Sequence, residues 1–246
     1  MLLPREKIVS NTLSPLVSAI IPTFNRRSYV VEAIESALAQ SYRPIEVIVI
    51  DDGSTDGTAA ALAHFGSQIR YIWQTNQGTS VARNHGITAS RGELLAFVDS
   101  DDLWEPDKLT LQVAALTNNP EAHAVLERLR QFYSPELSAE DRSRLWCPDG
   151  IAPGFAPATL LIWRQAFLAV GPFNPENRTA EFMEWMIQAD EAALCILKME
   201  ACIYRRRIHA SNKGIAKSDT FSDRARLIKN ALDRRRRASA SGEVIA

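Results

Sequence analysis

The sequence lacks the features that define several large classes of protein. Its longest apolar runs, such as 45–50 and 94–98, are far shorter than the roughly 20 residues needed to span a bilayer. The three cysteines form no C-x-x-C pair and are odd in number, so neither a disulfide framework nor a cysteine zinc site is supported. Residues 4–7 are Pro, Arg, Glu and Lys, where a secretory signal would be apolar. These absences predict a cytoplasmic protein.

Motifs of three common enzyme classes are absent as well. No G-x-G-x-x-G follows the first apolar run, which argues against a dinucleotide-dependent dehydrogenase. The chain has no G-x-x-x-x-G-K-[ST], so a P-loop kinase or ATPase is excluded. It also has no G-x-S-x-G, the elbow that carries the nucleophile of many Ser-His-Asp hydrolases. The function must therefore be sought in other polar motifs.

Charge is balanced overall but unevenly distributed. The formal net charge is −1, yet residues 203–246 hold twelve Lys and Arg against four Asp and Glu. The runs 205–207 and 234–237 could contact nucleotide phosphate, nucleic acid or an anionic membrane surface, or could form a solvated helix end. We expect no nucleic acid partner, and a peripheral contact of the basic tail with the inner face of the membrane stays open.

Short apolar runs alternate with helical patterns through the first 120 of the 246 residues. Such alternation is typical of α/β proteins, in which helices flank a mostly parallel sheet. The later part is less regular, because 124–132 fits a strand or a helix and 134–154 has the composition of a loop. The predicted strands are 17–21, 45–50, 69–73, 93–98 and 201–206, and the predicted helices are 28–40, 58–65, 80–90, 106–118 and 181–188.

Polar side chains follow the predicted strands of the first part. Ligands of an open parallel sheet bind beyond the carboxyl ends of its strands, so these residues should gather at one edge. Clustered carboxylates repel each other unless a cation lies among them, and oxygen ligands favour Mg²⁺ or Mn²⁺ over zinc. The residues concerned are Thr23, Asn25, Asp51, Asp52, Asp99, Asp101 and Asp102.

Four motifs, three of which contain these residues, follow one another within the first 104 residues. Each is weak alone, because Asp-Gly-Ser is a common turn and D-x-D triplets occur by chance, but chance does not explain their order. The motifs are IIPTFNR, VIVIDDGSTDGT, NQGTSVARNHGI and LLAFVDSDDLW. Together they resemble the family 2 glycosyltransferases, inverting enzymes of the GT-A fold that use nucleotide sugars. The resemblance is strong over 16–120 and weaker to residue 215.

The resemblance implies one GT-A domain with a Rossmann-like, mostly parallel sheet flanked by helices. It divides the chain into an N-terminal extension (1–15), a nucleotide-sugar-binding half (16–120), an acceptor-binding and catalytic half (121–215) and a basic C-terminal helix and tail (216–246). The implied reaction moves a sugar from a nucleoside diphosphate sugar, such as a UDP-sugar, to an acceptor with inversion. The acceptor could be a glycan, a lipid-linked intermediate, a small molecule or a peptide.

The resemblance also implies roles for residues around the nucleotide. Thr23 and Asn25 would line the nucleotide pocket. Asp51 would accept hydrogen bonds from the base, with Asp52 beside it, and Arg83 would lie close to the base. These five residues are the predicted nucleotide contacts.

A second set of implied residues surrounds the diphosphate. Asp99 would face the ribose and the metal, and Asp101 would ligate the Mn²⁺ or Mg²⁺ that bridges the diphosphate. His209 would also reach the metal, and Arg207 would contact the phosphates. A cation held there would stabilise the charge that builds up on the departing diphosphate, in place of a proton donor.

Inversion further needs a general base that takes a proton from the attacking acceptor. In the family this base lies near the start of a late helix, and the matching stretch here is 179–185, with Phe182 where alignment gives an aspartate. Glu181 and Glu184 are three residues apart, so they share one face of a helix. We favour Glu184, because an acid followed by Trp185 resembles a variant of the motif. If neither acts, the protein is a non-catalytic nucleotide-sugar-binding protein of the same fold.

Overall fold

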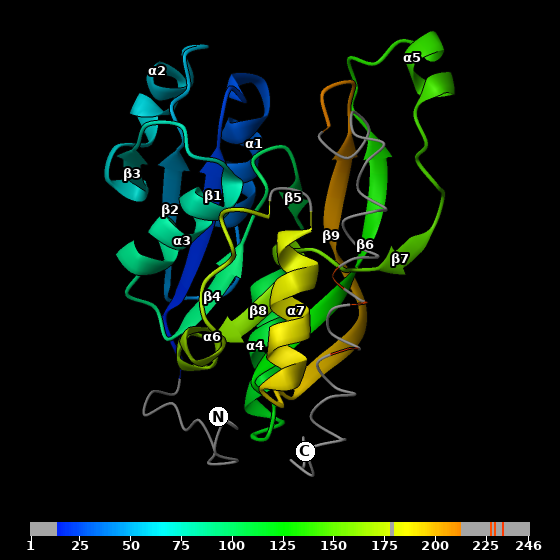
Figure 1. Ribbon diagram of the computed structural model, residues 1–246. Helices are drawn as coiled ribbons and strands as arrows, with labels where there is room; N and C mark the ends of the chain where they lie inside the picture. Colours follow the sequence, from blue (N-terminus) through cyan, green and yellow to red (C-terminus); the bar gives the residue numbers. More distant parts are fainter. Residues whose placement is uncertain (1–13, 178–179, 213–226, 228, 230–232, 234–246) are drawn as a thin grey trace.

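The first half of the chain forms four strands and the helices between them (Figure 1). The strands are β1 (Val17–Thr23), β2 (Ile45–Asp51), β3 (Arg70–Trp73) and β4 (Leu94–Phe97). They are connected by α1 (Arg27–Leu38), α2 (Thr58–Leu62) with the 3-10 helix η1 (Ala63–Gln68), and α3 (Thr79–Ala89). The structure is a computed structural model, and it describes residues 14–177, 180–212, 227, 229 and 233. The predicted elements of this half are confirmed, with small differences at their ends.

The second half contains both the longest and the shortest strands, and its connecting segments are more varied than those of the first half. It comprises β5 (Leu103–Trp104), α4 (Lys108–Thr117), β6 (Ala124–Tyr133), α5 (Ala139–Arg144), β7 (Ile151–Pro153), η2 (Pro157–Thr159), β8 (Leu160–Trp163), α6 (Arg164–Val170), α7 (Glu181–Glu191) and β9 (Ile196–Ile208). The prediction of a loop over 134–154 was wrong in part. Ser138 caps α5 by accepting from the Asp141 N–H, and β7 is held by pairing with β6.

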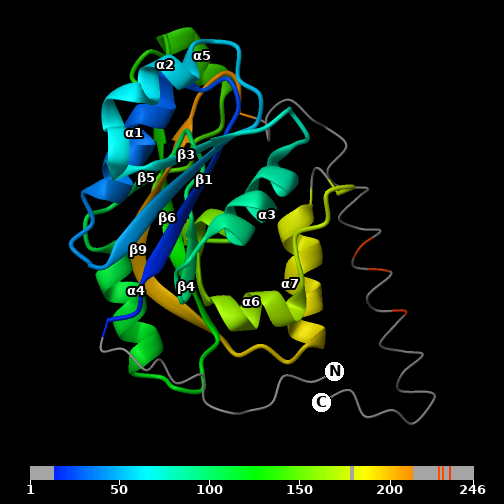
Figure 2. The same cartoon turned by 90° about the vertical axis from the view of Figure 1, so that its left-hand side faces the viewer.

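The nine strands found among the described residues belong to one sheet. Its order is β3-β2-β1-β4-β8-β6-β9-β5, and β7 pairs with β6 outside this path. The four strands of the first half are parallel, β8 runs antiparallel to β4 and β6, and β9 is parallel to β6. In Figure 2 the sheet lies between α1 and α2 on one side and α3, α6 and α7 on the other. The predicted single α/β domain with a mostly parallel sheet is therefore confirmed.

The centre of the sheet is apolar on both faces because helices cover both. Every residue of β1 and β4 is buried, as expected for parallel strands enclosed by helices. Gly86 allows α3 to approach β1 closely, since a Cβ at this position would lie 2.4 Å from Cγ2 of Ile20. This dry, tightly packed centre holds the strand ends in fixed positions.

The carboxyl ends of β1, β2, β4, β6 and β9 lie at the same edge of the sheet, at the top of Figure 1. Asp56 ties two connections at this edge together, because its carboxylate accepts from the backbone N–H groups of Arg27 and Thr58 at the starts of α1 and α2. Both halves of the chain thus contribute to one polar edge.

Parts of the predicted domain division cannot be compared with the fold. The extension predicted for 1–15 lies almost wholly outside the described residues. The helix and tail predicted for 216–246 lie outside them too, except for Leu227, Lys229 and Asp233, which are helical. Within the described ranges, no helix combines the length and the apolar character needed to cross a bilayer.

Candidate functional site

The turn after β4 begins with Asp99, which is joined to the second half of the chain through an arginine. Arg83, on α3, donates to Asp99 at 2.6 Å and to Glu181, the first residue of α7, at 3.0 Å. Burial lowers the pKa of Arg83, but the charges and hydrogen bonds of the two carboxylates outweigh it and raise that pKa. The buried guanidinium therefore stays charged and fixes the start of α7 against α3 and the turn after β4.

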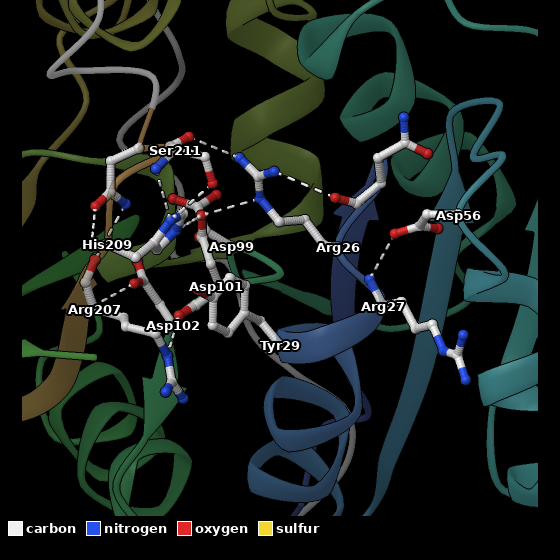
Figure 3. Close-up of polar contacts among 12 residues, drawn as sticks. Arg26, Arg27, Tyr29, Asp56, Asp99, Asp101, Asp102, Arg207, His209 and Ser211 are labelled. Atoms are coloured by element: carbon white, nitrogen blue, oxygen red, sulfur yellow. Dashed lines mark hydrogen bonds and ion pairs between the residues drawn. The ribbon is translucent and has the colours of Figure 1, made fainter. Parts of the chain in front are cut away.

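Two residues further along, Asp101 contacts the end of β9. Its Oδ2 lies 3.0 Å from Nε2 of His209 and 3.5 Å from Nε of Arg26 (Figure 3). The backbone N–H of Ser211 donates to Nδ1 of His209, which leaves the proton on Nε2 to be donated to Asp101. Burial raises the pKa of Asp101, but the His209 hydrogen bond and charge, together with Arg26, bring it below its usual value.

Asp101 and His209 fit a divalent cation as a pair of ligands. Two ligands at about 2.1 Å from an ion and at right angles lie about 3 Å apart, which matches the observed contact. For Nε2 of His209 to bind a cation, its proton would have to move to Nδ1, which would then donate to Oγ of Ser211, 3.0 Å away, in place of accepting from the Ser211 N–H. Among the residues that the structure describes, no group of three His, Cys, Asp or Glu side chains could hold a metal. Asp99 therefore does not join Asp101 and His209 as a third ligand, and oxygens of a bound donor would have to complete the coordination of the cation.

Asp102 is buried and holds β9 in place. It accepts from the hydroxyl of Tyr204 and from the backbone N–H of Arg207. Burial, with the neighbouring charges of Asp101 and Asp99, raises the pKa of Asp102 well above its usual value, against these hydrogen bonds. The contacts fix the end of β9, from which His209 follows directly.

The predicted phosphate contact, Arg207, is used within the protein. Its guanidinium is buried, donates to Glu32 on α1 at 2.8 Å, and contacts the backbone oxygen of Asp101 at 3.0 Å. It also lies over the rings of Tyr29 and Phe132, at 5.2 and 5.0 Å from their centroids. These contacts make Arg207 part of the frame that joins β9, α1 and the Asp101 turn.

The two carboxylates that end β2 have separate partners. Asp51 is buried, with one oxygen accepting from the Ser54 N–H at 2.8 Å and the other from the hydroxyl of Tyr71 at 2.7 Å. Asp52 accepts from the side chain of Gln74 and from the backbone of Gln77 and Gly78, just before α3. Asp52 thus shapes the loop that carries Arg83.

The residues predicted from the end of β1 also act on the local backbone. Asn25 has a positive φ of 50° and interlocks with the next loop, because its N–H donates to Ser54 and its side-chain oxygen accepts from the Thr55 N–H. Thr23 is buried, and its hydroxyl has no hydrogen-bond partner among the described residues. The β1 and β2 loops therefore form one rigid unit.

The two candidate bases lie at different places on α7. Glu181 pairs with Arg83, which also pairs with Asp99, so one arginine links the two carboxylates. Glu184 accepts from the amides of Asn174 at 3.0 Å and Asn177 at 2.8 Å, and so holds the loop before α7. Of the two, Glu181 is thus the one that shares an arginine with Asp99.

Phe182 faces the apolar interior, and aromatic residues surround it. It is 5% exposed, stacks at 6.3 Å on Trp185, and meets the ring of Phe155 edge-on at 5.3 Å. Trp185 in turn stacks on Phe167 at 5.1 Å. The position where the family has an aspartate is thus part of an aromatic cluster, while Phe155 remains 52% exposed beside it.

Several residues at this edge have no predicted role. Arg26 lies inside the IIPTFNR motif, so the sequence contained a signal for it. Phe24 and Trp73 are 41% and 57% exposed, and Trp73 is in register with Asp51 on the neighbouring strand. Their exposure, which sequence does not give, is what singles them out. Tyr204 had no signal, because its partner Asp102 lies 102 residues earlier.

Comparison with known proteins places this geometry in a family. Residues 18–167 match the family described as Glycosyl transferase family 2. An uncharacterized glycosyltransferase of Nostoc sp. is 30% identical over 231 residues, covering 84% of this chain and 69% of that protein. Chondroitin synthase of Escherichia coli is 43% identical over 112 residues, covering 44% of this chain and 16% of the synthase. The chain spans only 33% of an uncharacterized glycosyltransferase of Rickettsia typhi, to which it is 45% identical.

Solved structures share the fold. S. aureus TarS in complex with UDP-GlcNAc superposes with a TM-score of 0.66 and 20% identity, covering 87% of this chain and 65% of that one. The mannosyltransferase PcManGT of Pyrobaculum calidifontis, in complex with GDP-Man and Mn²⁺, gives 0.62 and 21%, covering 82% and 59%. With the family match over more than half of the chain and the shared architecture, this protein belongs to glycosyl transferase family 2 and has the GT-A type of fold.

Proposed function

We propose that the protein transfers a sugar, with inversion, from a nucleoside diphosphate sugar bound at the carboxyl edge of the sheet to an acceptor. One observation carries this proposal: the Asp99–Asp102 turn makes contacts with both halves of the chain, through Arg83 to Glu181 and through Asp101 to His209. A transferase needs a donor site and a base within reach of each other. Family membership supports the same reading.

The nucleotide would lie across the ends of β1, β2 and β3. Asp51 ends β2 and is buried, with its oxygens bound by the Ser54 N–H and the Tyr71 hydroxyl, so a base would reach this acceptor only if the Tyr71 hydroxyl moved aside. The exposed rings of Phe24 and Trp73 offer faces on which a base can stack. Structural relatives were solved with UDP-GlcNAc and with GDP-Man. These relatives support a UDP- or GDP-sugar as the donor, and we favour UDP.

Asp101 and His209 would hold a divalent cation with the diphosphate. Such a cation stabilises the negative charge of a departing nucleoside diphosphate, so no proton donor is needed for the leaving group. Asp102, Tyr204 and Arg207 position these two side chains by fixing the turn against β9. The relative solved with GDP-Man also contains Mn²⁺.

Glu181 is our candidate for the general base. It would accept the proton of the acceptor as the acceptor attacks the anomeric carbon. Its partner, the buried Arg83, also pairs with Asp99 and so holds the Glu181 carboxylate in one position. Glu184 would act as a positioning residue for the loop that contains Asn174 and Asn177.

A second candidate function is binding of nucleotide sugar without transfer. The burial of Phe182 in the aromatic cluster favours it, because no carboxylate occupies the place of the family's aspartate. If the protein is a transferase, Glu181→Gln should abolish release of nucleoside diphosphate from the donor and leave donor binding intact. If it only binds nucleotide sugar, the substitution should change neither.

Calorimetric titration tests the shared core of both functions. UDP and GDP would be titrated with and without Mn²⁺ into the unmodified protein and into Asp101→Asn. We expect one of the two nucleotides to bind in a metal-dependent way and the binding to be lost in the variant. If neither nucleotide bound the unmodified protein, the proposed donor site would be wrong.

A further inference from the structure

Three arginines surround the carboxylates of the Asp99–Asp102 turn, and they are held very differently. The side chain of Arg83 is 5% exposed and makes two close ion pairs, at 2.6 and 3.0 Å. The side chain of Arg207 is 3% exposed and pairs with Glu32 at 2.8 Å. Arg26 and its partner Asp101 are each 18% exposed, and their contact is 3.5 Å long. Arg26 is therefore the most loosely paired and most accessible of the three.

The other contacts of Arg26 are to neutral groups. Its two terminal nitrogens donate to backbone oxygens, of Asn25 at 3.3 Å and of Ser211 at 3.0 Å. A guanidinium can make a bidentate pair with a carboxylate or a phosphate, and such pairs are stronger than bonds to neutral carbonyls. Arg26 makes no such pair with Asp101, so little is lost when it leaves that carboxylate.

The backbone that carries Arg26 is fixed although its side chain is not. Asn25 interlocks with Ser54 and Thr55, and the N–H of Arg27 is bound by Asp56. Figure 3 shows the side chain of Arg26 directed toward Asp101 and Ser211, while that of Arg27 points to the opposite side. A fixed backbone thus directs one of two adjacent arginines, Arg26, toward the carboxylate of Asp101.

We propose that Arg26 is the exchangeable counter-ion of Asp101: it balances this carboxylate in the donor-free protein, competes there with a divalent cation, and pairs with the donor's diphosphate once the donor binds. The inference deepens the proposed function and rests on it for the identity of the donor. It gives Arg26 opposite effects on the two ligands, since its charge opposes the cation and attracts the diphosphate.

Binding of Mn²⁺ in the absence of nucleotide tests the first effect. The signal of free Mn²⁺ in electron paramagnetic resonance would be followed during titration of the full chain, of Arg26→Gln and of Arg27→Gln. Arg27→Gln is the matched control, because it removes the same charge from the next residue. We expect Arg26→Gln to bind Mn²⁺ about tenfold more tightly than the unmodified protein and Arg27→Gln to stay unchanged. When Arg26→Gln is combined with Asp101→Asn, which removes the carboxylate, the gain in Mn²⁺ affinity should be lost.

Binding of UDP or GDP at saturating Mn²⁺ tests the second effect. Arg26→Gln should lose about tenfold in nucleotide affinity, the effect of one charge-assisted hydrogen bond, and Arg26→Lys should recover part of it. A merely structural role would weaken both ligands together. Equal Mn²⁺ affinity in Arg26→Gln and Arg27→Gln would overturn the inference. If no nucleotide bound any variant while Arg26→Gln still gained Mn²⁺ affinity, the proposed function would fail and exchange at Asp101 would stand.

Discussion

The central strands β1 and β4 differ from β6 and β9 in where charged residues lie. In β1 and β4 every residue is buried and none is charged, and the acids stand just beyond the strand ends. In β6 and β9 charged residues lie within the strands themselves, where Glu127 pairs with Lys108 and Arg207 pairs with Glu32. In β1 and β4 the residues that stabilise the sheet are thus separate from the acids of the candidate site, whereas β6 and β9 contain residues of both kinds. Substitutions in the second half should therefore disturb folding and function together.

The largest effect is expected from the two glutamates of α7. Glu181→Gln should slow release of nucleoside diphosphate from the donor sugar by about 10²- to 10⁴-fold, the usual contribution of a general base. Glu184→Gln should slow it by less than about tenfold, because this residue holds the Asn174–Asn177 loop through hydrogen bonds that a glutamine keeps in part. A coupled assay for UDP or GDP measures both, with donor affinity as the control. The reverse ranking would restore Glu184 as the candidate base.

Stability should depend strongly on the buried ion pair between α4 and β6. Nζ of Lys108 lies 2.7 Å from Oε1 of Glu127, and both side chains are fully buried. Lys108→Met leaves an unpaired buried carboxylate and should cost about 3–5 kcal/mol of unfolding free energy. Lys108→Met combined with Glu127→Leu should recover most of that loss. Urea denaturation measures both, and a double variant no more stable than the single one would contradict this account.

The stability of the first half of the chain should depend on packing between α3 and the sheet more than on charge. Gly86→Ala improves helix propensity by about 1 kcal/mol, but its Cβ would lie 2.4 Å from Cγ2 of Ile20 and 3.3 Å from Cγ1 of Ile50. Overpacking of this kind costs about 1–3 kcal/mol, so we expect a net loss of stability. Thermal unfolding measures it. A raised midpoint would mean that α3 is free to move away from β1.

The smallest effect is a pH dependence at the far end of β2. Glu46 accepts from the hydroxyl of Ser18 and from the N–H groups of Arg91 and Gly92. Burial raises the pKa of Glu46, but the hydrogen bonds from Ser18 and Arg91 and the charge of Arg91 bring it below its usual value. A lowered folded pKa adds stability above the ordinary glutamate pKa, and this is lost as pH falls through the folded pKa. Glu46→Gln should thus cost about 1 kcal/mol near neutral pH and nothing in strong acid. A difference that persisted in acid would contradict the assignment.

The sequence was most informative where structure is local. Strands β1 to β4 could be predicted from their apolar runs, and the topology rule for parallel sheets then placed Asp51, Asp99 and Asp101 at one edge. β7, with three residues, is too short to leave a periodic signal. The long strands β6 and β9 were predicted only in part, because their mixture of charged and apolar residues has no clean alternation.

Contacts between distant segments could not be predicted from spacing or periodicity. Arg83 and Glu181 are 98 residues apart, and Asp101 and His209 are 108 apart. It was the resemblance to a family, and not spacing or periodicity, that placed His209 and Asp101 beside the same metal. The resemblance also favoured Glu184 over Glu181, although the placement of the two depends on the conformation of the loop that contains Asn174 and Asn177. Only the folded arrangement shows which glutamate is held near the Asp99 turn.

The most direct test of the donor site is a crystal structure of the protein grown with UDP and Mn²⁺, with the ion located by its anomalous scattering. Our account predicts one Mn²⁺ about 2.2 Å from both Oδ2 of Asp101 and Nε2 of His209, with the UDP base beside Asp51 and Arg26 turned to the diphosphate. UDP bound elsewhere, or bound while the Asp101–His209 hydrogen bond stays intact, would contradict it.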